Sequence, residues 1–204
     1  MTIHKAGYTN IAICILIIFL LNAVIQFYAP QAFVFKWLVY ILSLVFFAGT
    51  IWFFRDPAIE IITNDKAILS PADGIVTAIT QVDENEFAQG SYTKISITIA
   101  LTDVRVNRSP MRGTIKHTQT NGHATVVIES KTGTIIVYRQ LPGYTKHLVT
   151  YASKGGAITQ GDQLGFAMGG SNVEVMLPAD SPVSVQVNDA VKSGQTVLAK
   201  LKSS

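Results

Sequence analysis

The chain has 204 residues, of which 49% are hydrophobic and only 14% charged, and its formal net charge is +3. This charged fraction lies well below the roughly 25% that is usual in soluble domains. The deficit is local, because residues 6–54 contain a single charge, Lys36. The composition therefore excludes a uniformly soluble chain and predicts a membrane anchor followed by a soluble domain. With Cys14 as its only cysteine the chain has no intramolecular disulfide, which fits a reducing compartment.

Two apolar runs, residues 11–29 and 37–54, make up the predicted anchor. At about 1.5 Å of rise per residue, a helix over either run spans roughly the ~30 Å hydrocarbon layer. The short turn "PQAFVFK" joins them, so we expect a helical hairpin with both ends on one side. A signal peptide fits less well because a second apolar run follows at once. A single span followed by an interfacial helix stays open.

The charges that flank the hairpin suggest its orientation. Lys5 and Arg55 lie on one side of the predicted anchor and Lys36 on the other. The positive-inside rule then favours the cytoplasm for both ends, by a small margin. We therefore expect residues 1–54 in the cell (inner) membrane and a β-rich domain of residues 55–204 on the cytoplasmic side.

After Phe54 the sequence alternates between apolar and polar residues in short segments separated by turns. Strands are predicted over residues 74–82, 94–100, 113–120, 124–130, 134–141 and 147–152. We find no window of 11 residues with a helical period in this part of the chain. The pattern predicts an all-β domain, a barrel or sandwich of short antiparallel strands.

Two later stretches, residues 153–165 and 187–201, repeat one theme. Each has an apolar residue, a polar-Gly-polar turn and a further apolar strand. Small sandwiches of the biotinyl and lipoyl carrier type are built in this way, although ordinary hairpins match as well. Neither repeat offers a lysine at a hairpin tip between apolar residues, so a carrier function is not expected.

Four cations fall within 12 residues, at Arg105, Arg108, Arg112 and Lys116. They are compatible with a solvated face, or with a surface that meets anionic lipid head groups, where each charge contributes about 1 kcal/mol. A nucleic-acid partner is not expected, because the chain lacks a recognition helix and an aromatic stacking platform.

The stretch "FAMGGSNVEVMLP", residues 166–178, leads into the strand pattern through Gly169, Gly170 and Ser171. Glycine within a strand-like pattern marks a turn, a bulge or a close backbone approach. A tight turn between two strands is one interpretation. The other is that the peptide bond before Ser171 is a reaction centre.

Four segments in order carry a resemblance to a known family: "FFRDP" (53–57), "SPADG" (70–74), "VNRSPMRG" (106–113) and "GGS" (169–171). Over about residues 37–180 the chain resembles the short form of the phosphatidylserine decarboxylases, which are pyruvoyl enzymes. The resemblance implies that the Gly170–Ser171 bond cleaves itself and that Ser171 becomes the pyruvoyl group. The products would be a β chain of residues 1–170 and an α chain of residues 171–204.

The resemblance also implies the reaction. The amine of phosphatidylserine would form a Schiff base with the pyruvoyl group at Ser171, and loss of CO₂ would lead to phosphatidylethanolamine. The electron sink comes from the chain itself, so neither pyridoxal phosphate nor a metal is implied. Asp73 in "SPADG" matches the family's processing aspartate, which would orient or activate the base for Ser171. The implied partners are phosphatidylserine, membrane lipids and the chain's own two fragments as a heterodimer, with a higher oligomer open.

The chain departs from the family pattern at two positions. Short-form members read "VHVNR" where this chain has "VRVNR", residues 104–108, so Arg105 replaces a histidine. Arginine stays protonated and is no general base, but it binds carboxylates and phosphates. We therefore expect Arg105 to bind substrate, together with Asn107 and Arg108. Asn172 stands where the family tends to have arginine.

Another histidine is the alternative source of a proton-transferring group. His4 precedes the membrane anchor, whereas His117, His123 and His147 lie in or beside predicted strands. Of these we favour His147, which follows a glycine-containing loop.

Three functions remain open at this point. The first is a membrane-bound decarboxylase of phosphatidylserine, supported by the intact Gly170–Ser171 pair and Asp73. The second is a non-catalytic, membrane-anchored β-sandwich relative with a binding or structural role, supported by Arg105 and Asn172. The third is a decarboxylase of another serine-like head group.

Overall fold

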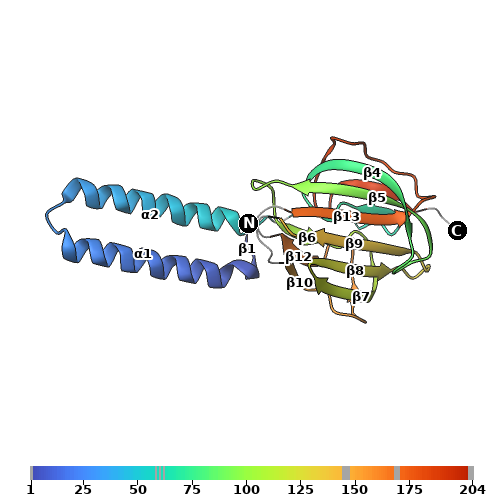
Figure 1. Cartoon of the computed structure of the whole chain (residues 1–204), viewed down its shortest axis with the longest axis horizontal. Coiled ribbons are helices and arrows are strands. Elements are labelled where there is room, and N and C mark those ends of the chain that lie inside the picture. The colour runs from blue at the N-terminus through green and yellow to red at the C-terminus, as the bar shows by residue number, and fades with distance from the viewer. Residues whose placement is uncertain are drawn as a thin grey trace. The chain divides into compact units, whose positions relative to one another are not determined.

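The computed structural model describes residues 2–57, 59, 61, 63–143, 148–167 and 171–201. The chain divides into two compact units, Met1–Ala58 and Ile59–Ser204. The first unit contains a pair of helices and the second is built from antiparallel sheets (Figure 1). The expected fold class, an all-β domain preceded by a helical hairpin, is confirmed.

Two apolar helices of 21 residues each form the first unit, α1 (Tyr8–Tyr28) and α2 (Phe33–Phe53). A short 3-10 helix, η1 (Lys5–Gly7), precedes them, and β1 (Thr2–Ile3) pairs with β2 (Arg55–Asp56). Both helices are long and apolar enough to cross a membrane, and most of their large side chains point outward. Length and composition thus support the predicted hairpin.

Small residues line the contact between α1 and α2. The Cys14 sulfur lies 3.6 Å from the Thr50 hydroxyl, and Ser43 is buried. The turn between the helices is shorter than predicted, because α2 begins at Phe33. Pro30 ends the first helix, and Lys36, one turn into α2, donates to the Pro30 carbonyl at 2.7 Å.

An eight-stranded antiparallel sheet dominates the second unit. In spatial order its strands are β11 (Ala157–Ile158), β7 (Gly113–Asn121), β8 (His123–Glu129), β9 (Ile135–Leu141), β13 (Ser171–Pro178), β5 (Gly90–Ile99), β4 (Gly74–Glu84) and β14 (Ala190–Val191). Strand β13 lies between β5 and β9 in the middle of this sheet (Figure 1). The strand that begins with Ser171 is therefore held on both edges.

Two smaller sheets complete the unit. One contains β10 (Leu148–Thr150), β12 (Gln163–Ala167) and β6 (Val106–Arg108), and the other pairs β3 (Ala67–Leu69) with β15 (Val197–Lys200). The main core contains Val173, Val175 and Leu177, which share one face of β13. All six predicted strands are present, and β12 is the strand expected after the turn of the first repeat, whereas the short β3 and β6 were not predicted.

Two turns of the second unit share a sequence pattern and its hydrogen bonds. They are "SPADG" (70–74) and "SPMRG" (109–113). In each, the serine hydroxyl donates to the carbonyl two residues on, at 2.7 Å. The N–H of the residue before each serine donates to the proline carbonyl of the other turn, at 2.9 and 2.8 Å. This reciprocity relates the two halves of the unit by an approximate two-fold axis.

The two repeats seen in the sequence belong to the same symmetry. Gly161 in the first repeat donates its N–H to Ser109 at 2.9 Å, and Gly194 in the second donates to Ser70 at 2.8 Å. Both glycines have positive φ, +86° and +70°, which other residues adopt with strain. Each repeat thus belongs to one half of the unit: residues 187–201 to the half with the turn 70–74, and residues 153–165 to the half with the turn 109–113.

Candidate functional site

Ser171 is the first residue of β13 and pairs with Ile99 of β5. It is 6% exposed, and its hydroxyl oxygen has no hydrogen-bond partner among the described residues. Buried polar side-chain atoms are normally hydrogen-bonded, so an unpartnered hydroxyl needs an explanation. Gly170, the other residue of the predicted cleavage site, lies outside the described residues.

An open pocket of about 650 Å³ lies beside Ser171. It is lined by the end of β5, the loop after it, the residues that follow β9 and the start of β13: Thr98, Ile99, Ala100, Leu101, Thr102, Pro142, Gly143, Ser171 and Asn172. The Thr98 hydroxyl donates to the Asn172 side-chain oxygen at 2.9 Å. Leu101 is 51% exposed, so the pocket combines polar groups with an apolar edge.

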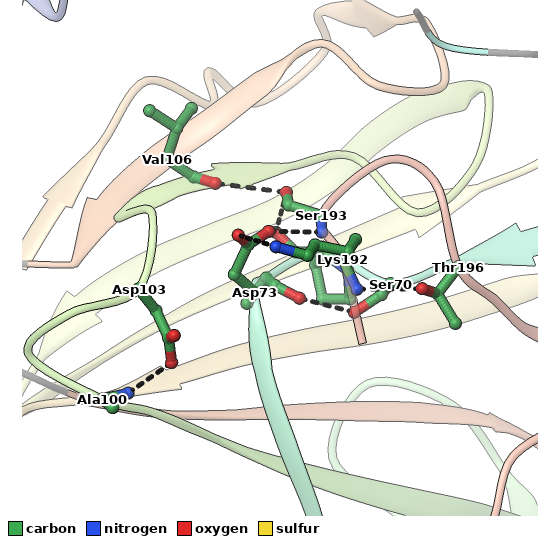
Figure 2. Close-up of polar contacts among 10 residues, drawn as sticks. Ser70, Asp73, Ala100, Asp103, Val106, Lys192, Ser193 and Thr196 are labelled. Atoms are coloured by element: carbon green, nitrogen blue, oxygen red, sulfur yellow. Dashed lines mark hydrogen bonds and ion pairs between the residues drawn. The ribbon is translucent and has the colours of Figure 1, made fainter. Parts of the chain in front are cut away.

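Asp73 lies in the turn before β4, where the segment that joins β14 to β15 covers it. One carboxylate oxygen accepts the Ser193 N–H at 2.7 Å, and the other lies 3.8 Å from the Lys192 ammonium (Figure 2). Burial raises the pKa of Asp73 above its ordinary value of 3.8, and the Ser193 hydrogen bond and the Lys192 charge oppose that rise. Ser193 is fixed in turn, since its hydroxyl lies 2.9 Å from the carbonyl oxygen of Pro71.

Asp73 also faces the loop that lines the pocket. The Asp103 charge raises the pKa of Asp73 and the Val104 backbone lowers it, and Asp103 accepts the Ala100 N–H at 2.8 Å (Figure 2). Residues 100–102, which precede Asp103, line the pocket beside Ser171. Within the described part of the chain, no hydrogen bond or ion pair joins Asp73 to Ser171. The loop that carries Asp103 thus connects the surroundings of Asp73 with the pocket.

The two-fold axis gives Asp73 a natural comparison. The corresponding position in the second turn is Arg112, which is exposed and lies 4.0 Å from Asp65. The second turn makes the same serine and glycine hydrogen bonds without a carboxylate. A carboxylate is therefore not required to form this turn, and the buried Asp73 needs another reason.

Arg105, expected to bind substrate, is buried and only 1% exposed. Its guanidinium donates to the Leu101 carbonyl, and its own carbonyl accepts the Ala167 N–H at 2.8 Å. Arg105 thus links the pocket loop to the end of β12. It is not among the described residues that line the pocket.

The other two predicted substrate-binding residues also lie away from the pocket lining. Asn107 is fully buried, and neither amide atom has a hydrogen-bond partner in the described part. Arg108 is half-buried and donates to the Gly161 carbonyl at 3.1 Å. Both residues belong to β6, and their contacts lie within the fold.

The four clustered cations do not form one face. Lys116 pairs with Glu129 at 2.5 Å and Arg112 lies 4.0 Å from Asp65, whereas Arg105 is buried. The interpretation as a solvated face is therefore wrong for Arg105. Arg105 precedes β6, Arg112 lies in the turn before β7 and Lys116 lies within β7, so proximity in sequence did not bring these charges to one face.

None of the described histidines lines the pocket beside Ser171. The His117 ring stacks on Phe87 with centroids 5.0 Å apart, and His123 is half-buried where β8 begins. His4 caps η1 in the first unit. His147, the favoured substitute, lies outside the described residues. In the described part, no group of three or more His, Cys, Asp or Glu is placed to hold a metal.

Sequence reasoning missed Lys192 and Ser193, which contact Asp73. Their signal was the repeat itself, because the turn of residues 192–195 occupies the place that residues 159–162 occupy in the other half. Sequence reasoning also missed Gln140, a fully buried amide on β9. A glutamine within an alternating strand carries no sign of the face it occupies.

The chain was compared with known proteins. The family model described as phosphatidylserine decarboxylase matches residues 46–124 and 118–199. A phosphatidylserine decarboxylase proenzyme of Cytophaga hutchinsonii is 33% identical, and the alignment covers 100% of both chains. Proteins of the same name from Bacteroides thetaiotaomicron (32%, 98% of this chain and 95% of the relative) and Porphyromonas gingivalis (30%, 98% and 99%) are similar over nearly their whole lengths. No solved structure matches.

Proposed function

The chain belongs to the phosphatidylserine decarboxylase family, and we propose that it is a proenzyme that cleaves its own Gly170–Ser171 bond. The cleaved protein then converts phosphatidylserine to phosphatidylethanolamine with the pyruvoyl group that Ser171 becomes. One observation carries the proposal: the Ser171 hydroxyl is buried, has no partner among the described residues, and belongs to a residue that lines an open pocket.

Self-cleavage needs only groups of the chain and water. The Ser171 oxygen attacks the Gly170 carbonyl carbon, the C–N bond breaks, and the acyl group moves from nitrogen to oxygen as an ester. Loss of the Ser171 α-proton expels the Gly170 carboxylate and leaves a dehydroalanine. Water then releases ammonia, and a pyruvoyl group blocks the new N-terminus. A hydroxyl without a competing hydrogen bond suits the first step.

The residues around Ser171 are compatible with a pyruvoyl group at this position. Position 171 is buried beside a pocket, and β5 and β9 hold the strand that follows it. When formed, the pyruvoyl group supplies an electron sink for the bond that decarboxylation breaks. Asn172 is held by Thr98 at the pocket wall, where it is positioned to orient a polar head group. The loop of residues 100–102 lines one side of the pocket.

The pocket suits a phospholipid head group. Its hydroxyl and amide groups offer hydrogen bonds to polar atoms, and the exposed Leu101 offers apolar contact to the glycerol or acyl part. The two apolar helices would keep the enzyme at the bilayer that contains this substrate. We place the β unit on the cytoplasmic side of the cell membrane, as the flanking Lys5 and Arg55 favour.

Cleavage would leave both fragments in one folded unit. The segment 171–204 supplies β13, β14 and β15, and β13 pairs with a strand of the large fragment on each edge. The Asp73 contacts with Lys192 and Ser193 also cross between the two fragments. The active form is thus a heterodimer of the chain's own two pieces.

A denaturing gel with mass spectrometry tests the proposal. The purified wild-type chain should give two species, the smaller of which starts at position 171 with a blocked N-terminus. Ser171→Ala should stay as one chain of about 22.1 kDa. A wild-type chain that stays intact would favour a non-catalytic relative instead. Turnover of phosphatidylserine against another serine-containing phosphate ester would identify the head group.

A further inference from the structure

Three buried polar residues lie together among the buried side chains of the β unit. This interior polar cluster contains Asn107 of β6 and Tyr138 and Gln140 of β9, none of which is more than 2% exposed. Burial raises the pKa of Tyr138, so its phenol stays protonated and acts as a donor. It donates to the Gln140 side-chain oxygen at 3.2 Å. The reaction steps described above use none of these three groups.

Gln140 connects two strands that meet near the predicted cleavage site. Its side-chain nitrogen donates to the Phe166 carbonyl of β12 at 3.4 Å. Its backbone pairs with Val173 of β13, two residues beyond Ser171 on the same face. Residues in this diagonal relation have Cα atoms about 7–8 Å apart. Gln140 therefore contacts Phe166, four residues before Gly170, and pairs with the strand that begins at Ser171.

Close packing fixes the end of β12 at this point. A Cβ on Gly165 would lie 2.3 Å from the Val149 carbonyl oxygen and 3.5 Å from the Gln140 side-chain oxygen. Only glycine permits this approach. On the other side, the Ala167 N–H donates to the Arg105 carbonyl. The end of β12 is thus held by its neighbours on both sides.

We propose that Gln140, oriented by Tyr138, is a positioning residue for the self-cleavage reaction at Ser171, an inference that rests on the proposed function. The Tyr138 hydroxyl occupies the Gln140 oxygen, so the amide presents its nitrogen to the Phe166 carbonyl. This bond fixes the last residues of β12 relative to the first residues of β13. Phe166 before the reacting bond and Ser171 after it are thereby kept at a fixed separation, and a shift of about 1 Å in such a position costs roughly 10²-fold in rate.

Cleavage kinetics of the full-length chain in detergent micelles test this role. Gln140→Leu should lengthen the cleavage half-time roughly 10- to 100-fold, and Tyr138→Phe should lengthen it by less. If Tyr138 acts through Gln140, the double variant should be no slower than Gln140→Leu. The matched control is Gln160→Leu, which removes a buried amide that donates to Ala67 and Pro110. It should lose thermal stability but cleave at the wild-type rate.

Hydroxylamine separates positioning from a later chemical defect, because it cleaves the ester that the first step forms. In Gln140→Leu it should not speed the appearance of the small fragment, since the attack on Gly170 is the slowed step. Acceleration would overturn the proposal, as would equal slowing in Gln160→Leu or a double variant slower than Gln140→Leu. If Gln140→Leu does not fold, the cleavage rate of Tyr138→Phe alone tests the proposal. Cleavage of Tyr138→Phe at the wild-type rate would refute the positioning role. An uncut wild type would refute the proposed function itself.

Discussion

Asp73 offers a prediction that separates folding from function, because the second half of the β unit supplies an internal control. The Ser193 N–H donates to one oxygen of its carboxylate at 2.7 Å, and the Lys192 ammonium lies 3.8 Å from the other. Asp73→Ala removes the carboxylate and leaves the buried Ser193 N–H without an acceptor. Asp73→Asn keeps one oxygen acceptor and removes the charge. Arg112→Ala changes the corresponding residue of the other half.

The expected changes in stability follow from these contacts. An unsatisfied buried donor costs about 1–3 kcal/mol, so Asp73→Ala, which strands the Ser193 N–H, should lower the free energy of unfolding by about 1–3 kcal/mol. Asp73→Asn should lie within about 1 kcal/mol of wild type, because removing a buried charge offsets one weakened hydrogen bond. Arg112→Ala should change the free energy by about 0.5 kcal/mol or less, since an exposed pair at 4.0 Å contributes little.

The pH dependence has a definite sign. Burial raises the pKa of Asp73 above 3.8, so the folded chain binds a proton more tightly than the unfolded chain. Raising the pH through the window just above 3.8 should therefore lower the unfolding free energy of wild type relative to Asp73→Asn. Below pH 3.8 Asp73 is protonated in both the folded and the unfolded chain. There the unfolding free energy of wild type relative to Asp73→Asn should be highest.

Thermal melts across this pH range, paired with a cleavage gel at neutral pH, make the test. We expect Asp73→Asn to fold well yet cleave slowly, and Arg112→Ala to match wild type in both assays. The reasoning fails if Asp73→Asn cleaves at the wild-type rate. It fails equally if Arg112→Ala and Asp73→Asn slow cleavage by the same factor.

Three further predictions concern other parts of the chain. The fragments 1–170 and 171–204 should co-elute on gel filtration after cleavage and separate only in denaturant, because β13 is paired on both edges; separation in native buffer would contradict this. Arg105→Lys keeps a donor for the Leu101 carbonyl, so it should preserve more turnover than Arg105→Met. In Arg105→Met the KM for phosphatidylserine should rise. If wild type cleaves but does not decarboxylate, and Arg105→His restores turnover, Arg105 is a disabling substitution. Tags at the two termini should be reachable only from the cytoplasmic face, and a C-terminal tag found outside the cell would reverse the orientation.

Short runs of apolar and β-branched residues between turns predicted the long strands. Strands β4, β5, β7, β8 and β9 were found within a few residues of their predicted bounds. β8 is buried on both faces, so its apolar run, not alternation, marks it. β3 and β6 are only three residues long, too short for either signal to show. Strand β6 reads "VNR", in which a buried asparagine replaces an expected apolar residue. Short strands that tertiary contacts hold in place leave little trace in the sequence.

The sequence motifs indicated Ser171 and Asp73 but not how they are related in space. Asp73 does not contact Ser171 and instead bonds to Ser193, which is 120 positions away in the chain. Arg105 was grouped with its charged neighbours, yet its strand-like segment turned it inward. Motif spacing names candidate residues, whereas the face that each one occupies is set by sheet pairing.

The approximate two-fold axis shows where this fold departs from its own repeat. Both halves build the same serine-proline turn and close it with a positive-φ glycine. In the first half the position before the strand is a buried carboxylate whose partners include Lys192, and in the second half it is an exposed arginine beside Asp65. The fold alone requires neither, since one framework accommodates both charges. Asp103, close to Asp73 in the first half, holds the Ala100 N–H at the pocket wall. β13, which begins with Ser171, lies in the same half of the large sheet as β4 and β5. We therefore expect the buried carboxylate of Asp73 to serve the reaction rather than the fold.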